Sequence, residues 1–144
     1  MIQSVAKLER LLLAVDDSDA SGRAISIARE LAQRAGCEVM VLHVRDRQIC
    51  CKGPAWERPM SCTPDEFVAG LVSDLRNAGI DAVGEIHSSL NHREGDEILA
   101  SAEAFDADLI VAGVGRHRLT LGILEKSTGR KIVEHSRRPL LLVP

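Results

Sequence analysis

Basic side chains are concentrated in one segment of an otherwise acidic chain. Seven lysines and arginines but only two acids lie between Gly113 and Arg138, whereas the net charge of the whole chain is −3. The basic residues are Arg116, Arg118, Lys126, Arg130, Lys131, Arg137 and Arg138. Because the overall charge does not favour nucleic acid, this segment indicates a small anionic ligand rather than a polyanion. The alternative is that these side chains form the solvated face of a loop and a helix.

Other functional classes lack the residues that they require. Aromatic residues make up 2% of the chain and tyrosine is absent, so the stacking surfaces of single-stranded nucleic-acid binding are missing. There is no G-x-S-x-G, no P-loop and no G-x-G-x-x-G after the first apolar run. His43 and His135 have no partner residues in a catalytic pattern. We therefore expect a binding or regulatory protein rather than an enzyme, with no catalytic residues.

The cysteines do not follow the spacing of a zinc site. Of the four, Cys50 and Cys51 are adjacent, and no C-x-x-C pair is present. We expect free thiols and no metal. The alternative is a redox or soft-metal site, because Cys50, Cys51 and Cys62 lie within thirteen residues of each other.

The sequence predicts a cytoplasmic protein with no contact to membranes. No apolar run approaches the roughly 20 residues that a membrane-spanning helix needs. The first ten residues, MIQSVAKLER, contain one apolar stretch that is too short for a signal peptide.

Apolar runs and helical spacings alternate along the whole sequence, which predicts one α/β domain over residues 1–144. Runs without polar interruption are typical of strands that are covered on both faces, as in a parallel sheet. The expected strands are Leu11–Val15, Val39–Val44, Ile80–His87 at a sheet edge, Leu109–Gly113 and Pro139–Val143. The expected helices are Ser18–Gly36, Thr63–Gly79, Asp96–Phe105 and Ser127–Ser136, and residues 45–62 are expected to form an irregular loop.

Alternation of this kind, with right-handed crossovers, predicts an open, doubly wound parallel sheet with helices on both faces. Such sheets bind ligands at the carboxyl ends of the strands where the winding direction reverses. Here the reversal lies between the first strand, which ends at Asp16, and the fourth, which ends at Gly113. Asp16 and Ser18 also have the residue types that cap a helix, so a purely structural role is an alternative for them.

Four short motifs in register resemble the universal stress protein family. They are V-D-D-S at Val15–Ser18, L-H-V at Leu42–Val44, D-L-I-V-A-G at Asp108–Gly113 and R-P-L-L-L-V at Arg138–Val143. The resemblance covers essentially the whole chain. It implies a five-stranded sheet of order 3-2-1-4-5, as in the adenine nucleotide alpha hydrolase-like fold.

The resemblance also implies positions for a nucleotide. ATP-binding members carry G-x-x-G, nine further residues and then G-S or G-T, starting at the end of the fourth strand. In this chain Gly113 holds the first position, Arg116 and Lys126 replace the other two glycines, and Ser127 keeps the hydroxyl, followed by Thr128. Gly115 lies one residue before the position of the second glycine.

The two replacements have opposite possible effects. A side chain at Arg116 or Lys126 occupies space that phosphates need, yet both are cations that could bind a phosphate directly. At the other end of the implied site, Asp16 faces the ribose and adenine while Ala14 and Val44 line the base. We therefore expect a crevice that binds ATP or another adenine nucleotide weakly.

We also expect a homodimer. The Pro139–Val143 strand is apolar and uncharged, and as a free sheet edge it would otherwise be a template for aggregation. The alternative function is a stress protein that binds no nucleotide and acts only through protein partners.

Overall fold

Strands and helices alternate in the computed structural model, which describes residues 7–16, 18–47, 63–90, 93–114 and 128–144. In chain order the elements are β1 (Arg10–Ala14), α1 (Asp19–Ala35), β2 (Glu38–Arg47), α2 (Pro64–Asn77), β3 (Ala82–Leu90), α3 (Glu94–Phe105), β4 (Leu109–Gly113), α5 (Thr128–His135) and β5 (Leu140–Val143).

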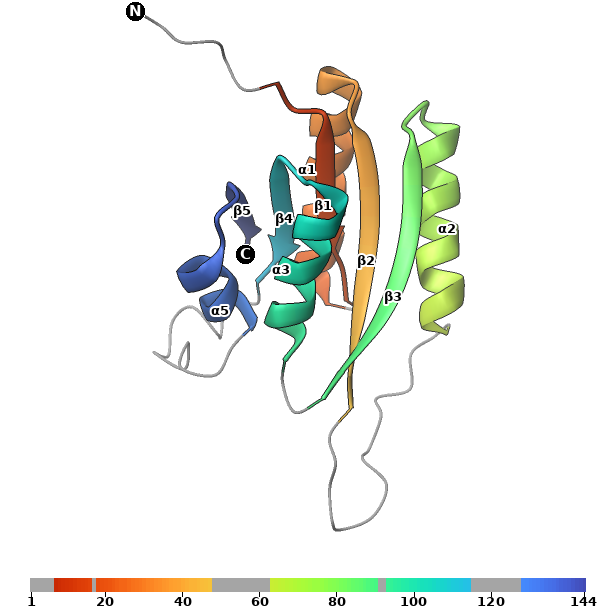
Figure 1. Ribbon diagram of the computed structural model, residues 1–144. Helices are drawn as coiled ribbons and strands as arrows, with labels where there is room; N and C mark the ends of the chain where they lie inside the picture. The colour runs from red at the N-terminus through yellow and green to blue at the C-terminus, as the bar shows by residue number, and fades with distance from the viewer. Residues whose placement is uncertain (1–6, 17, 48–62, 91–92, 115–127) are drawn as a thin grey trace, which may run out of the picture.

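The strands form one parallel sheet of order β3-β2-β1-β4-β5, which confirms the predicted fold (Figure 1). β1 lies in the centre, where Ala14 is paired with Leu42 of β2 on one side and with Ala112 of β4 on the other. The winding direction therefore reverses between β1 and β4, as the sequence predicted. β3 and β5 form the two edges.

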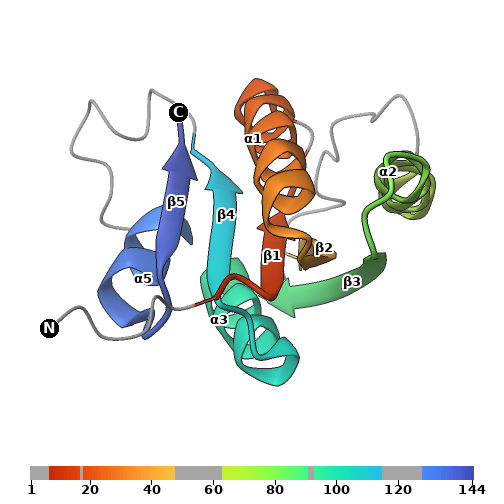
Figure 2. The ribbon, with the colours of Figure 1, turned by 90° about the horizontal axis from the view of Figure 1, so that it is seen from above.

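Helices cover both faces of the sheet. α1 and α2 lie on one face and α3 and α5 on the other, as the view from above in Figure 2 shows. The core is accordingly divided into two clusters. Leu11, Leu13, Val39 and Val41 pack towards α1 and α2, and Leu12, Leu42 and Ile110 pack towards α3 and α5. This burial on both faces explains why the strands are continuous apolar runs.

Local signals define the helix ends. Ser18 caps α1, and Gly36 ends it in the left-handed conformation with φ of 66°. The predicted capping box of α2 is present: Thr63 Oγ1 accepts from the Glu66 amide and Glu66 Oε2 accepts from the Thr63 amide. α3 begins after Arg93, which makes no side-chain capping bond.

The predicted loop at 45–62 begins too early, because β2 continues through Arg47. Arg45 and Arg47 are paired with Ser88 and Leu90 of β3. The charged Arg45 is tolerated in the strand because it forms an ion pair with Asp65 at the start of α2, with an N–O distance of 2.9 Å. Residues 48–62, including Cys50, Cys51 and Cys62, lie outside the described residues.

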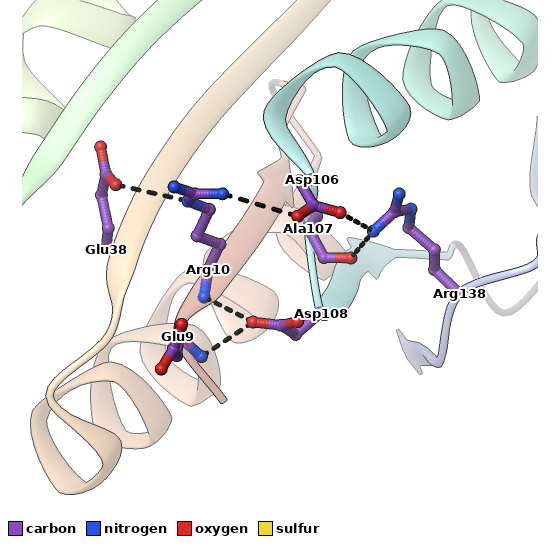
Figure 3. Close-up of polar contacts among 7 residues, drawn as sticks. All are labelled: Glu9, Arg10, Glu38, Asp106, Ala107, Asp108 and Arg138. Atoms are coloured by element: carbon purple, nitrogen blue, oxygen red, sulfur yellow. Dashed lines mark hydrogen bonds and ion pairs between the residues drawn. The ribbon is translucent and has the colours of Figure 1, made fainter. Parts of the chain in front are cut away.

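Charged side chains tie together the amino ends of the central strands (Figure 3). Asp108 Oδ2 accepts from the backbone amides of Glu9 and Arg10 at 2.8 and 2.9 Å. The Arg10 guanidinium pairs with Glu38 and Asp106, at 3.9 and 3.7 Å. Because the two amide hydrogen bonds favour the ionised carboxyl group, they hold the pKa of Asp108 below its ordinary value.

Candidate functional site

The candidate site lies at the carboxyl ends of β1 and β4, where the winding direction reverses. Ala14 ends β1 and is buried, and Gly113 ends β4 beside it. Val15 continues the pairing, because its amide donates to the Leu42 carbonyl at 2.9 Å. The chain then leaves the sheet at Asp16 and enters α1.

Asp16 is exposed and has a carboxylate oxygen available for a ligand. Its Oδ1 accepts from the Ser18 amide at 2.8 Å, which tightens the turn into α1. Its backbone amide donates to Ser21 Oγ at 2.8 Å. The other oxygen, Oδ2, has no hydrogen-bond partner among the residues that the structure describes. The predicted capping role therefore belongs to Ser18, whose Oγ accepts from the Ser21 amide, while Asp16 shapes the turn before it.

Gly113 is required for packing, whatever it does for a ligand. A Cβ atom there would lie 2.5 Å from the Ala20 carbonyl carbon and 2.6 Å from the Ser21 backbone nitrogen. The first turn of α1 thus packs directly against the backbone at the end of β4. The family resemblance gave Gly113 as the first glycine of the ATP-binding motif, and the structure adds a packing reason for the same residue type.

His43 of β2 contacts the carboxyl end of β1. The side chain is buried, and Nδ1 lies 2.9 Å from the Val15 carbonyl oxygen, which accepts its proton. The next residue, Val44, is half-buried and packs with Ala14 and Leu42 on the α3 side of the sheet.

Besides Arg138, which pairs with Asp106 at 3.1 Å, two cations of the basic segment pair with acids. Lys131 on α5 lies 3.0 Å from Asp96 on α3, and Arg130 lies 2.7 Å from Glu134 one helical turn later. Asp96 also lies 3.5 Å from Arg93. These two positions fit the alternative explanation of the basic segment better than they fit a cluster of cations waiting for an anion.

The remaining predicted phosphate positions are not placed. Gly115, Arg116, Lys126 and Ser127 lie outside the described residues. Thr128 is the first residue of α5, and its side chain lies outside the described part of the structure. Their assignment to a ligand therefore stays a prediction.

A polar cluster between β3 and α3 escaped the sequence analysis. His87 Nε2 lies 2.8 Å from Glu85 Oε2, and His87 Nδ1 lies 3.3 Å from Glu97 Oε2 and 3.2 Å from Ser101 Oγ. Alternation in β3 put Glu85 and His87 on one face, but nothing in the sequence indicated that α3 packs there. In the described ranges no three His, Cys, Asp or Glu side chains are grouped to bind a metal ion.

The fold and the strand order define a doubly wound α/β protein with its candidate site at the topological switch point. A sequence model of the universal stress protein family matches residues 7–144. The chain therefore belongs to the universal stress protein family. A search of curated proteins found no sequence match.

Solved structures support the same fold. A universal stress protein crystallised in complex with cAMP superposes with a TM-score of 0.71 and 18% identity, covering 96% of this chain and 99% of that one. A universal stress protein from Archaeoglobus fulgidus in complex with dAMP gives a TM-score of 0.64 and 20% identity, with 96% and 100% covered. A family protein from Arabidopsis thaliana with AMP bound gives 0.63 and 16%, with 94% and 90% covered.

The described helices include none that is both long enough and apolar enough to cross a membrane.

Proposed function

We propose that this chain is a cytoplasmic, non-catalytic stress-response regulator whose crevice binds an adenine nucleotide weakly. The observation that carries the proposal is the exposed Asp16 carboxylate at the switch point, with Oδ2 unpartnered among the described residues. A carboxylate in this position accepts hydrogen bonds from ribose hydroxyls. The adenine nucleotides bound to three structural relatives support this class of ligand.

The described residues fit the nucleoside end of such a ligand. Ala14 has a small side chain, and the half-buried Val44 offers an apolar surface for a base. The phosphate end rests on the predicted positions Arg116, Lys126 and Ser127. Of the nearby described cations, Lys131 is already paired with Asp96, which favours weak rather than tight binding of the phosphates.

Calorimetric titration with ATP, ADP, AMP and cyclic AMP tests this function. Asp16→Ala should weaken binding of all four about tenfold, because a hydrogen bond to a charged group contributes about 1.5–3 kcal/mol. Asp81→Ala is the matched control, since Asp81 precedes β3 at the opposite end of the sheet. This variant should bind the four nucleotides with the same affinity as the parent protein. If none of the four nucleotides binds, the nucleotide proposal fails and the partner-only function replaces it.

The double change Arg116→Gly and Lys126→Gly separates two roles of these cations. If they block the crevice, restoring both glycines of the family motif raises the affinity for ATP. If they bind phosphate, the same change lowers the affinity for ATP but leaves adenosine unaffected. Equal affinity for ATP in the parent protein and the double variant would contradict both roles.

We also propose that the chain is a homodimer paired through β5. β5 is an edge strand of four apolar residues, and its backbone groups on one side have no strand partner in the described sheet. Beside it lies an open groove between α1 and the chain end, lined by Arg23, Ile27 and Val143 among others. Ile27 is 37% exposed, so a second copy would cover apolar surface as well as an edge.

Light scattering tests the dimer. Leu141→Lys should shift the protein towards the monomer, because a charge is placed in the paired strand. Val83→Lys changes an exposed apolar residue on the opposite edge strand, β3, and should leave the dimer intact. A parent protein that stays monomeric at all concentrations would contradict this proposal.

A further inference from the structure

A second concave site lies at the other end of the sheet from the crevice. It is a cavity of about 120 Å³ between the second half of α3 and the connection from α5 to β5. Leu99 of α3 is half-buried and gives it an apolar floor, with the almost fully buried Ala102 of α3 and Ile110 of β4 behind it. α3 also contributes Glu103, and the connection contributes His135, Ser136, Arg137 and Arg138.

Hydrogen bonds hold the wall formed by the α5–β5 connection. Ser136 Oγ accepts from the Arg138 amide at 3.1 Å and donates to the Arg138 carbonyl at 2.8 Å. The Arg138 guanidinium donates to the Ala107 carbonyl at 2.6 Å and to Asp106 Oδ1 at 3.1 Å (Figure 3). Arg138 is thus tied to the turn between α3 and β4. The wall is preorganised by contacts that a ligand does not have to form.

The two walls carry opposite charges that do not pair with each other. Glu103 on α3 and Arg137 on the connection both line the cavity. Neither side chain has a hydrogen bond or an ion pair within the described ranges. A carboxylate on one side, a guanidinium on the other and an apolar floor between them form a polarised pocket. A simple anion is attracted by Arg137 but repelled by Glu103, and a simple cation is attracted by Glu103 but repelled by Arg137.

We propose that this pocket binds a small α-amino acid as its zwitterion. Arg137, supported by the fixed Arg138, receives the carboxylate, Glu103 receives the ammonium group, and a short aliphatic side chain lies against Leu99. A volume of about 120 Å³ is somewhat smaller than the ~150 Å³ of a cavity that holds benzene, which limits the ligand to a small amino acid. Such a site would let the protein respond to a metabolite through a surface separate from the nucleotide crevice.

The test is a titration of the full chain with L-valine, followed through the methyl NMR resonances of Leu99 and Ile110. Saturable shifts of both resonances are expected, and isobutyrate and isobutylamine, which each lack one charge, should bind at least tenfold more weakly. Arg137→Gln should weaken L-valine about tenfold. Arg29→Gln on α1, an exposed arginine outside the pocket, should have no effect.

Glu103→Gln gives the sharpest result because its sign depends on the ligand class. For a zwitterion the change removes the ammonium partner, so the affinity for L-valine falls. For a simple anion the change removes repulsion, so the affinity for isobutyrate and phosphate rises. Binding of isobutyrate as tight as that of L-valine, or no shift of either resonance, would overturn the proposal. Nucleotide binding at the crevice is measured separately and does not depend on this outcome.

Discussion

The two ends of the sheet are held together by different kinds of contact. At the amino end, charged groups form a network in which Asp108, Arg10, Asp106 and Arg138 connect β1, β4 and the start of β5. At the carboxyl end, neutral hydroxyls and close backbone packing position the first turn of α1 against Gly113. The amino end therefore supplies pH-dependent stability, whereas the carboxyl end leaves the Asp16 carboxylate largely exposed for a ligand.

The largest loss of stability is expected at Gly113, where the backbone of β4 lies directly against the backbone of α1. Gly113→Ala places a Cβ 2.5–2.7 Å from the backbone of α1, which cannot yield without moving the helix. We expect a loss of about 3 kcal/mol in the free energy of unfolding, measured in urea. Gly22→Ala is the matched control, because nothing lies within 4 Å of its Cβ position inside α1.

That control should keep the stability or raise it by about 0.5–1 kcal/mol, since alanine favours the helix. Equal effects of the two changes would mean that α1 does not lie this close to β4. The carboxyl end would then have lost its main packing constraint.

A smaller effect is expected at the amino end. Asp108→Ala removes the acceptor of two backbone amides and should cost about 2 kcal/mol at neutral pH. Because the folded pKa of Asp108 is lowered, its contribution is complete above the ordinary value of 3.8 and is lost as pH falls through the lower folded pKa. The difference between the parent protein and the variant should therefore shrink in acid.

Two variants define the origin of that pH dependence. Asp108→Asn keeps an acceptor but cannot ionise, so it should retain part of the stability and show the same acid behaviour as Asp108→Ala. Asp81→Asn changes a carboxylate that makes no side-chain hydrogen bond or ion pair among the described residues, so it should behave like the parent protein. A parent-minus-variant difference that stays constant down to about pH 2 would contradict the proposed clamp.

These effects also mark how far the sequence alone could predict the molecule. The apolar run Leu11–Val15 and the capping box at Thr63 are local signals, and both gave the right element. The sequence missed the extension of β2 to Arg47, because Arg45 and Asp46 are polar and the strand is stabilised there by β3 and Asp65. Contacts between distant segments decide such cases, and one sequence does not contain them.

For the candidate site too, some features could be predicted from the sequence and others could not. Alternation of strands and helices located the switch point, and the topology confirms that β1, which Asp16 follows, lies beside β4, which ends at Gly113. Spacing did not reveal that Gly113 is needed for the approach of α1, nor that Lys131 pairs with Asp96. A basic segment counted along the chain overstates the charge offered to a ligand when acids from another helix lie beside it.

The smallest effect is expected at the cap of α1, and its pH dependence sharpens the contrast between the two ends. Ser18→Ala removes the acceptor for the Ser21 amide and should cost about 1 kcal/mol. A hydroxyl does not titrate, so this loss should stay the same across the acid range in which the loss from Asp108→Ala shrinks. Thr63→Ala is the matched control at α2, where the reciprocal bond from Glu66 makes the expected loss equal or somewhat larger. Urea unfolding of the three variants at several pH values measures all of this. If the loss from Ser18→Ala shrank in acid as well, the α1 cap would depend on the Asp16 carboxylate, whose Oδ1 accepts from the Ser18 amide, and the division between a charged end and a mainly neutral end would not hold.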